Sequence, residues 1–356
     1  MKRKEEHAED GSPEISFVRA SDLLERNLRS GLNRDTDIYS GGWESPFDEV
    51  YNFRDQLMED YSGASLAEAL EGDIVENEFG SCYRITTEYP IVFSQVDESH
   101  CNGQILSDLT LVCGIGPHYQ DRLRSSGYSD IPGLLKHPKW GPQAREFLDI
   151  LQGQDITNLH RWMWRFLPKT HPLVYLSSGL LSPQDFAVFD IESMGLFESP
   201  IILFGIGKQV KGCVQVIQYL LTDISDEPAA LLETIKELQR SEALISFNGR
   251  AFDFPYLRDR LGFYGLEVIE EPPHFDLLHY TRRFLGGTLT GCSLGEVESY
   301  LGVEREVDLP SEMVPHFYER YLDTGNPGPL IPIVEHNKQD LVSLVSLFNK
   351  FHEMLT

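Results

Sequence analysis

The segment FAVFDIES, residues 186–193, carries the clearest strand signal in this chain of 356 residues. Its dense run of apolar residues predicts a buried β-strand. Side chains alternate between the two faces of a strand, so Asp190 and Glu192 point to the same side, about 7 Å apart along the chain. A pair of carboxylates on one face is typical either of a metal-binding strand or of an ordinary strand end in solvent. The segments that follow decide between the two.

The elements after this strand come in an α/β order. Apolar runs at 201–206 and 213–221 predict two more strands, followed by a helix over about 227–240 and a strand at 243–247. Three strands, a helix and a strand indicate an α/β fold. The remaining predicted elements are a helix over 252–261, a short segment at 274–276 leading into 277–284, a helix over 293–301 and a last long helix over about 333–355.

A third carboxylate follows the predicted strand at 243–247. In SFNGRAFDFPYL, residues 246–257, Asn248 and Gly249 make a turn and Asp253 enters the next helix. If the two strands are neighbours, Asp253 lies beside the first one. The alternative is an acidic residue in a first helical turn, where the helix dipole favours it anyway.

The fourth carboxylate is in the last helix, within EHNKQDL, residues 335–341. His336 and Asp340 are four residues apart and share one helix face, which could also be an ordinary exposed polar face. Four carboxylates with one basic side chain are what two Mg²⁺ or Mn²⁺ ions, about 3.5 to 4 Å apart, require for in-line phosphodiester hydrolysis. Hard divalent cations prefer such oxygen ligands.

These motifs resemble those of the DEDD exonucleases of the RNase-H-like superfamily, and more closely the YprB-type RNase-H-like domain family. The resemblance covers about residues 186–351, through FDIES, SFNGRAFDFPYL, the region from HFDLLHYTRRF to SLGEVESYLGVERE, and EHNKQDL. It implies an RNase-H-like mixed sheet flanked by helices and 3′–5′ exonuclease action. It also implies two divalent metal ions and assigns the four metal-binding acids to Asp190, Glu192, Asp253 and Asp340.

The resemblance gives His336 the place of the general base or water-positioning residue. Exonucleases of this group that use His have it five residues before the last Asp, whereas those that use Tyr have it four residues before, which is the spacing of His336. A His can still take a proton from water near neutral pH. Asp276 is a secondary candidate for the site, or alternatively a helix cap. Asn248 is a candidate substrate contact.

The part before residue 185 is predicted to be a smaller, mainly helical region. Residues 1–15 are expected to be a disordered tail, 16–151 an N-terminal domain, 152–184 a connector and 185–356 the RNase-H-like domain. Within 106–151, the sequence around Gly114-Ile115-Gly116-Pro117 looks like a helix-hairpin-helix unit. Gly114 and Gly116 would let backbone amides approach phosphate oxygens, or they form a purely structural turn.

The connector contains HRWMWR, residues 160–165, and Lys169. Its cations and tryptophans could contact a single nucleic-acid strand. The alternative is that Trp162 and Trp164 fill the interface between the two regions.

Composition sets outer limits on these interpretations. The formal net charge is −26, which is unusual for a protein that grips nucleic acid passively, although metal sites need carboxylates. Five scattered cysteines without a CxxC pair argue against a zinc ribbon and against a disulfide framework. No apolar run is long enough for a membrane span and no secretory signal is visible, so a soluble cytoplasmic protein is expected.

The sequence therefore predicts a metal-dependent nuclease that hydrolyses DNA or RNA. The alternative is a catalytically silent nucleic-acid-binding or adaptor protein that keeps the same fold. Such a protein would have no need for clustered acids that repel phosphate when metal is absent.

Overall fold

The computed structural model describes residues 48–196, 198–303, 305 and 309–356, and the expected tail at 1–15 lies outside them. Its centre is a seven-stranded mixed sheet with the order β1-β2-β5-β4-β3-β6-β7. The pairs β3–β6 and β6–β7 are parallel and the other pairs are antiparallel. The strands are β1 (Asp73–Asn77), β2 (Gly80–Tyr89), β3 (Phe186–Ser193), β4 (Ile201–Val210), β5 (Cys213–Leu220), β6 (Ala243–Ser246) and β7 (His274–Asp276).

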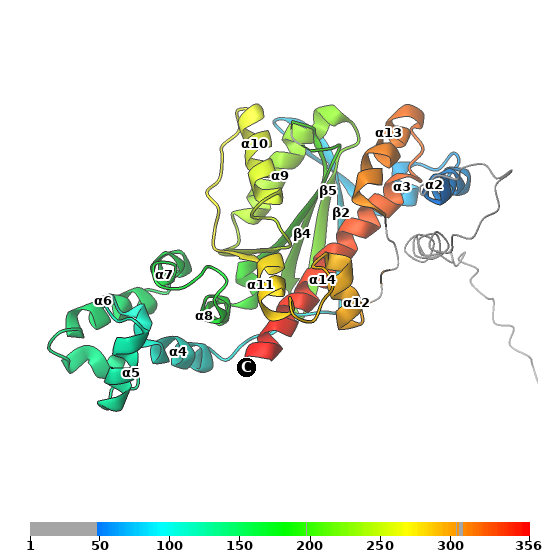
Figure 1. Ribbon diagram of the computed structural model, residues 1–356. Helices are drawn as coiled ribbons and strands as arrows, with labels where there is room; N and C mark the ends of the chain where they lie inside the picture. The colour runs from blue at the N-terminus through cyan, green and yellow to red at the C-terminus, as the bar shows by residue number, and fades with distance from the viewer. Residues whose placement is uncertain (1–47, 197, 304, 306–308) are drawn as a thin grey trace, which may run out of the picture.

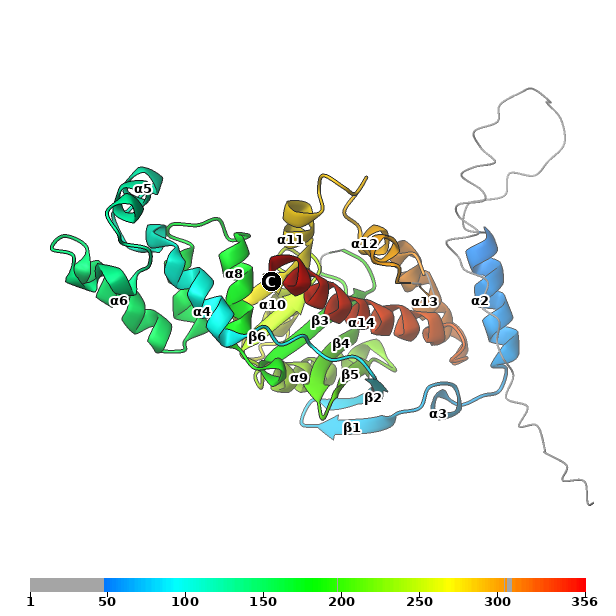
Figure 2. The ribbon, with the colours of Figure 1, turned by 90° about the horizontal axis from the view of Figure 1, so that it is seen from below.

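Helices cover both faces of this sheet (Figures 1 and 2). On one face α9 (Glu227–Leu238) and α10 (Asp253–Phe263) pack against alternate residues of β3 such as Ala187 and Phe189. On the other face the C-terminal half of the long helix α14 (Leu330–Leu355) packs against Phe186 and Val188. The alternation of β3 side chains thus gives each face its own apolar core. The predicted α/β fold, a mixed sheet flanked by helices, is confirmed.

The remaining helices of this part lie around α14 and the sheet. They are α2 (Asp48–Asp60), α3 (Leu66–Ala69), α11 (Leu277–Phe284), α12 (Leu294–Leu301) and α13 (Val314–Thr324). Within the described residues, no helix is both long and apolar enough to cross a membrane.

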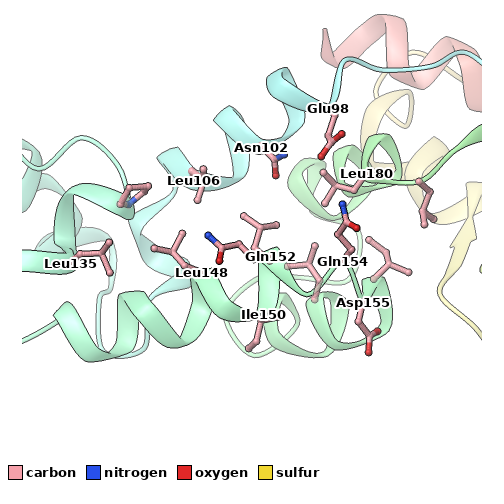
Figure 3. Close-up of a pocket in the computed structure, with 15 residues that line it drawn as sticks. Glu98, Asn102, Leu106, Leu135, Leu148, Ile150, Gln152, Gln154, Asp155 and Leu180 are labelled. Carbon is pink, nitrogen blue, oxygen red and sulfur yellow. The ribbon is translucent and has the colours of Figure 1, made fainter.

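A smaller helical unit projects from one end of the sheet (Figure 1). It consists of α4 (Glu98–Ser107), a 3-10 turn at Leu109–Leu111, α5 (Pro117–Ser125), a 3-10 turn at Pro132–Lys136, α6 (Gly141–Gln152) and α7 (Ile156–Met163), and α8 (Pro172–Leu176) leads back to the sheet. A mostly apolar pocket of about 550 Å³ lies between α4, α6 and α7, and none of the predicted site residues lines it (Figure 3).

The structure divides the chain differently from the predicted boundary at residue 151. Strands β1 and β2 come from the predicted N-terminal domain, yet β2 pairs with β5 and extends the sheet. The sheet therefore draws on residues 73–89 as well as 186–276. Residues 90–96 leave the sheet after Tyr89, where Pro90 has no N–H to offer a neighbouring strand.

Candidate active site

All four predicted carboxylates line one pocket of about 500 Å³ at an end of β3. His336 and Asn248 line it too. Four separate elements deliver these side chains: β3, the turn after β6, the start of α10 and the middle of α14. The structure thus brings together the acids, the histidine and the turn residue that the sequence singled out.

Asp190 is positioned by a row of residues that crosses three strands. In the sheet register Asp190 of β3 is opposite Gly205 of β4, and Gly205 is opposite Gln218 of β5. Directly opposed residues share a face, so Asp190 and Gln218 flank a position that has no side chain.

Asn337 of α14 fills the space above Gly205. Its Nδ2 donates a hydrogen bond to Asp190 Oδ2 (2.7 Å), and its Oδ1 accepts one from Gln218 Nε2 (2.8 Å). A Cβ on Gly205 would lie 2.2 Å from Asn337 Oδ1, so only glycine permits this approach. Asn337 and Gln218 are fully buried, and their mutual hydrogen bond fixes how the amide faces Asp190.

Asp253 begins α10 and is held against the backbone of β3. β3 pairs with β6 only as far as Val188, which leaves later amides of β3 without a partner on that side. Asp253 Oδ1 accepts a hydrogen bond from the Ile191 amide (3.2 Å). Asp253 is therefore fixed between the positions of Asp190 and Glu192, which is the neighbourhood expected if the two strands adjoin.

Asp340 and His336 lie together on α14 and share a cationic neighbour. Arg305 donates from Nη2 to Asp340 Oδ1 (2.6 Å), and its Nη1 is 3.3 Å from His336 Nδ1. Arg305 also pairs with the buried Glu298 of α12. Because a guanidinium only donates, His336 Nδ1 accepts here, and Nε2 lies 3.8 Å from Asp340 Oδ2.

Burial and mutual repulsion raise the pKa values of three of the clustered carboxyls. Burial raises the pKa of the Asp190 carboxyl well above its usual range, and the charges of Asp253, Asp340 and Glu192 raise it further. Burial likewise raises the pKa of Glu192, and it raises that of Asp253 to about 7. The Asn337 hydrogen bond acts in the opposite direction on Asp190. A bound cation would relieve this repulsion.

The donor set has the chemistry of a Mg²⁺ or Mn²⁺ site, but its side chains are turned to other partners. In the part of the chain that the structure describes, no three His, Cys, Asp or Glu side chains are arranged to hold a metal ion. Asp190 bonds to Asn337, Asp253 to the Ile191 amide and Asp340 to Arg305. Carboxylate oxygens without a nitrogen or sulfur ligand suit hard divalent cations, so the residues present fit such ions.

The secondary candidates have different places. Asp276 does not line the pocket. It caps α11 through the Leu278 amide and accepts hydrogen bonds from the amides of Asn248 (2.8 Å) and Arg250 (3.2 Å). It thereby fixes the turn in which Asn248 has φ +67°, a left-handed conformation that asparagine tolerates.

Gly114 and Gly116 lie in the helical unit and do not line the carboxylate pocket. Both are exposed, Gly114 has φ +87°, and Gly116 precedes α5 as its N-cap. The element before this turn is a short 3-10 turn rather than an α-helix. A helix-hairpin-helix motif is therefore not established by this geometry.

Four residues of the site were not identified from sequence. They are Gly205, Gln218, Arg305 and Asn337. One signal was available, because Gly205-Ile206-Gly207 places two glycines inside an otherwise apolar strand, and such glycines often mark the close approach of another segment.

Comparisons with known proteins concern the fold of this part of the chain. A family model of the RNase H superfamily matches residues 187–352. The YprB protein of Bacillus subtilis is 33% identical over 171 residues, which cover 45% of this chain and 40% of YprB. A PolC-type DNA polymerase III of Ureaplasma parvum is 34% identical over 179 residues, covering 43% of this chain and 12% of the polymerase. The chain thus spans less than half the length of these relatives.

Among solved structures, a family B DNA polymerase from Pyrobaculum calidifontis matches with a TM-score of 0.37 and 16% identity, over 48% of this chain and 24% of the polymerase. The family-model match covers most of the segment that contributes β3 to β7 and α14, and it includes all four carboxylates. Residues 187–352 therefore form an RNase-H-like domain, and the chain is similar in sequence to YprB.

Proposed function

We propose that this protein is a metal-dependent nuclease that removes nucleotides from DNA or RNA in the 3′ to 5′ direction. The observation that carries the proposal is the convergence of Asp190, Glu192, Asp253 and Asp340 on one pocket. The raised pKa values of three of these carboxyls support it, because perturbed carboxyls in a pocket are typical of functional sites. The resemblance of the motifs to those of DEDD exonucleases supports the direction of cleavage.

In this proposal Asp190, Glu192, Asp253 and Asp340 hold two Mg²⁺ or Mn²⁺ ions. Such ions lower the pKa of water and stabilise the charge on the leaving oxygen of a phosphodiester. His336 orients the attacking water from the helix face it shares with Asp340. It accepts the proton of the water at Nδ1, which Arg305 has to release for this step. Asn337 keeps Asp190 in one orientation through its hydrogen bond, so the carboxylate does not have to be ordered during the reaction.

Substrate contacts are assigned to the turn after β6 and to the helical unit. Asn248 is exposed at the pocket and its backbone is fixed by Asp276, so its side chain is placed to meet the terminal nucleotide. Gly114 and Gly116 offer backbone atoms to phosphates farther along the strand.

One observation favours the alternative of a silent nucleic-acid-binding protein. The ion pair between Arg305 and Asp340 supplies from within the protein some of the positive charge that a metal would bring. In such a protein Arg305 would keep Asp340 permanently, and added Mg²⁺ or Mn²⁺ would leave nucleic acid intact.

A cleavage assay on 5′-labelled single- and double-stranded DNA and RNA, with Mg²⁺, Mn²⁺ and EDTA compared, tests the proposal. We expect a ladder of stepwise shortened products that requires metal and disappears in Asp190→Asn. Asp259→Asn, which changes an exposed carboxylate of α10, is the matched control and should cleave as the parent does. Absence of cleavage of every substrate with either metal would reject the nuclease and leave the silent binding protein.

A further inference from the structure

A cluster of cations surrounds Trp164 on an otherwise strongly acidic chain. The Lys169 ammonium lies 4.8 Å, and the Arg250 guanidinium 5.5 Å, from the centre of the Trp164 rings. Lys169 is exposed, while Trp164 and Arg250 are half-buried. With a net charge of −26 for the whole chain, such a gathering of positive charge is a local exception.

Arg283, exposed in the last turn of α11, belongs to the same cluster. Arg283 follows Tyr280 by three residues on α11, so the two side chains are neighbours on that helix. The Tyr280 hydroxyl donates a hydrogen bond to the Lys169 carbonyl oxygen (3.3 Å). We define the Trp164 surface as Trp164, Lys169, Arg250 and Arg283.

This surface adjoins the carboxylate pocket. Arg250 is two residues after Asn248, which lines the pocket, and Asp276 holds the backbone amides of both. The turn is therefore fixed at two points, and the Arg250 side chain leaves it toward Trp164. A strand whose end lies in the pocket would meet Arg250 next.

Two acidic side chains lie close to Arg250. Glu271 pairs with Arg250 (3.4 Å) and with His274 (2.8 Å), and Asp276 is buried under the turn. Arg161 and Arg165 are different, because they line an open pocket together with Glu146, Asp149 and Asp155. Because three acidic residues line that pocket with them, Arg161 and Arg165 are left out of the Trp164 surface. Trp162 is buried, and its ring nitrogen donates a hydrogen bond to the Leu111 carbonyl oxygen. It therefore packs inside the protein and is not part of the surface.

We propose that the Trp164 surface binds the sugar-phosphate backbone of single-stranded nucleic acid and leads its end into the carboxylate pocket. Cations set beside an aromatic ring are typical of surfaces that follow a single strand without reading its bases. Lys169, Arg250 and Arg283 contact successive phosphates. Trp164 packs against the cationic groups of Lys169 and Arg250 and offers its edge to a base. This proposal rests on the proposed nuclease function, whose substrate it defines as a single strand.

The test is binding of a 5′-fluorescein-labelled oligothymidylate, measured by fluorescence anisotropy in EDTA at several salt concentrations. The parent is the full chain, and the patch variant combines Lys169→Glu with Arg283→Glu. The control combines Lys236→Glu in the last turn of α9 with Arg240→Glu just after this helix, which changes the net charge equally at another exposed place. Melting temperatures of all three proteins establish folding, and Lys169→Gln provides a milder second variant.

We expect the patch variant to bind roughly tenfold or more weakly, and its plot of log affinity against log salt to be shallower by about 0.7 for each phosphate that the protein no longer neutralises. The control should stay within about twofold of the parent, since long-range charge is screened beyond about 10 Å. Lys169→Gln should lie between parent and patch variant. A duplex of the same length should bind less tightly than the single strand.

Several outcomes would overturn the proposal. These are a parent that does not bind the oligonucleotide, a patch variant that binds as tightly as the parent, a control that weakens binding as much, and a preference for duplex. The nuclease proposal fails separately: a parent that binds the strand through this surface but never cleaves it with Mg²⁺ or Mn²⁺ retains the surface and loses the reaction.

Discussion

Asp253→Asn is expected to stabilise the metal-free protein in a way that depends on pH. Burial raises the pKa of the Asp253 carboxyl from 3.8 to about 7, and the charges of Asp276 and Asp340 add to the rise. The folded protein then binds this proton more tightly than the unfolded chain does. The contribution of this proton to the stability of the parent is complete below about pH 4 and is lost as the pH rises through 7. The advantage of the variant over the parent therefore grows across the same range.

The size of the effect follows from the two pKa values. Between them the free energy of unfolding of the parent falls by about 1.4 kcal/mol per pH unit, for a total on the order of 4 kcal/mol. Asparagine removes the titrating proton and keeps an oxygen to accept from the Ile191 amide. At pH 8 the variant should therefore melt on the order of 10 °C above the parent, and near pH 4 this advantage should vanish.

Thermal unfolding followed by intrinsic fluorescence, in EDTA from pH 4 to 8, measures both quantities. Asp259→Asn is the control, because this exposed residue lies on the same helix. Added Mg²⁺ or Mn²⁺ at pH 8 should raise the melting temperature of the parent more than that of Asp253→Asn. Melting temperatures of parent and variant that change in parallel across the pH range would refute the reasoning, as would a variant less stable than the parent at pH 8.

Three further predictions concern other parts of the site. His336→Ala should lower the turnover number by roughly 10² to 10⁴ while stabilisation by Mg²⁺ is retained, and His336→Tyr should recover part of the activity; cleavage at the parental rate from pH 6 to 9 would make His336 a bystander. Gly205→Ala should lower the free energy of unfolding by about 1 to 3 kcal/mol and slow cleavage, because its Cβ would meet Asn337. At Gly207 the nearest neighbour of a Cβ is 3.4 Å away, so Gly207→Ala should have a smaller effect on the free energy of unfolding, measured by chemical denaturation, and on the cleavage rate. Replacing Gly114 and Gly116 together by valine should weaken binding at low salt more than it slows cleavage of saturating substrate; equal affinity in a protein shown to be folded would reduce the helical unit to a spacer.

The sheet and helices of residues 186–355 were largely predictable because their signals are local. β3, β4 and β5 are nearly continuous apolar runs, as buried strands are, and α9 and α14 are long enough to be recognised as helices. β1 was not predicted. Its sequence DIVEN is mostly polar and largely exposed, and it is a strand because β2 pairs with it at the sheet edge.

The site was predictable where a role depends on residue type and spacing, and not where it depends on a partner distant in sequence. Asp190, Glu192, Asp253 and Asp340 are acids near the ends of predicted elements, so the pattern alone indicated them. Asn337 stands between two polar residues on a helix, and its burial follows from Gly205, 132 positions earlier. Arg305 lies outside the helices and strands, and only the tertiary fold brings its guanidinium to Asp340.

The row of Asp190, Gly205 and Gln218 makes the site sensitive to strand alignment. A slip of β4 by one residue would replace Gly205 by Phe204 or Ile206 opposite Asp190, and a side chain would occupy the space of the Asn337 amide. The arrangement also needs α14, which is the last helix of the chain, to dock over strands laid down more than a hundred residues earlier. A molecule with a misaligned sheet or an undocked C-terminal helix would therefore keep every acidic residue and still be unable to orient Asp190. The strand alignment, the docking of α14 and the orientation of Asp190 would thus be reached in the same folding step.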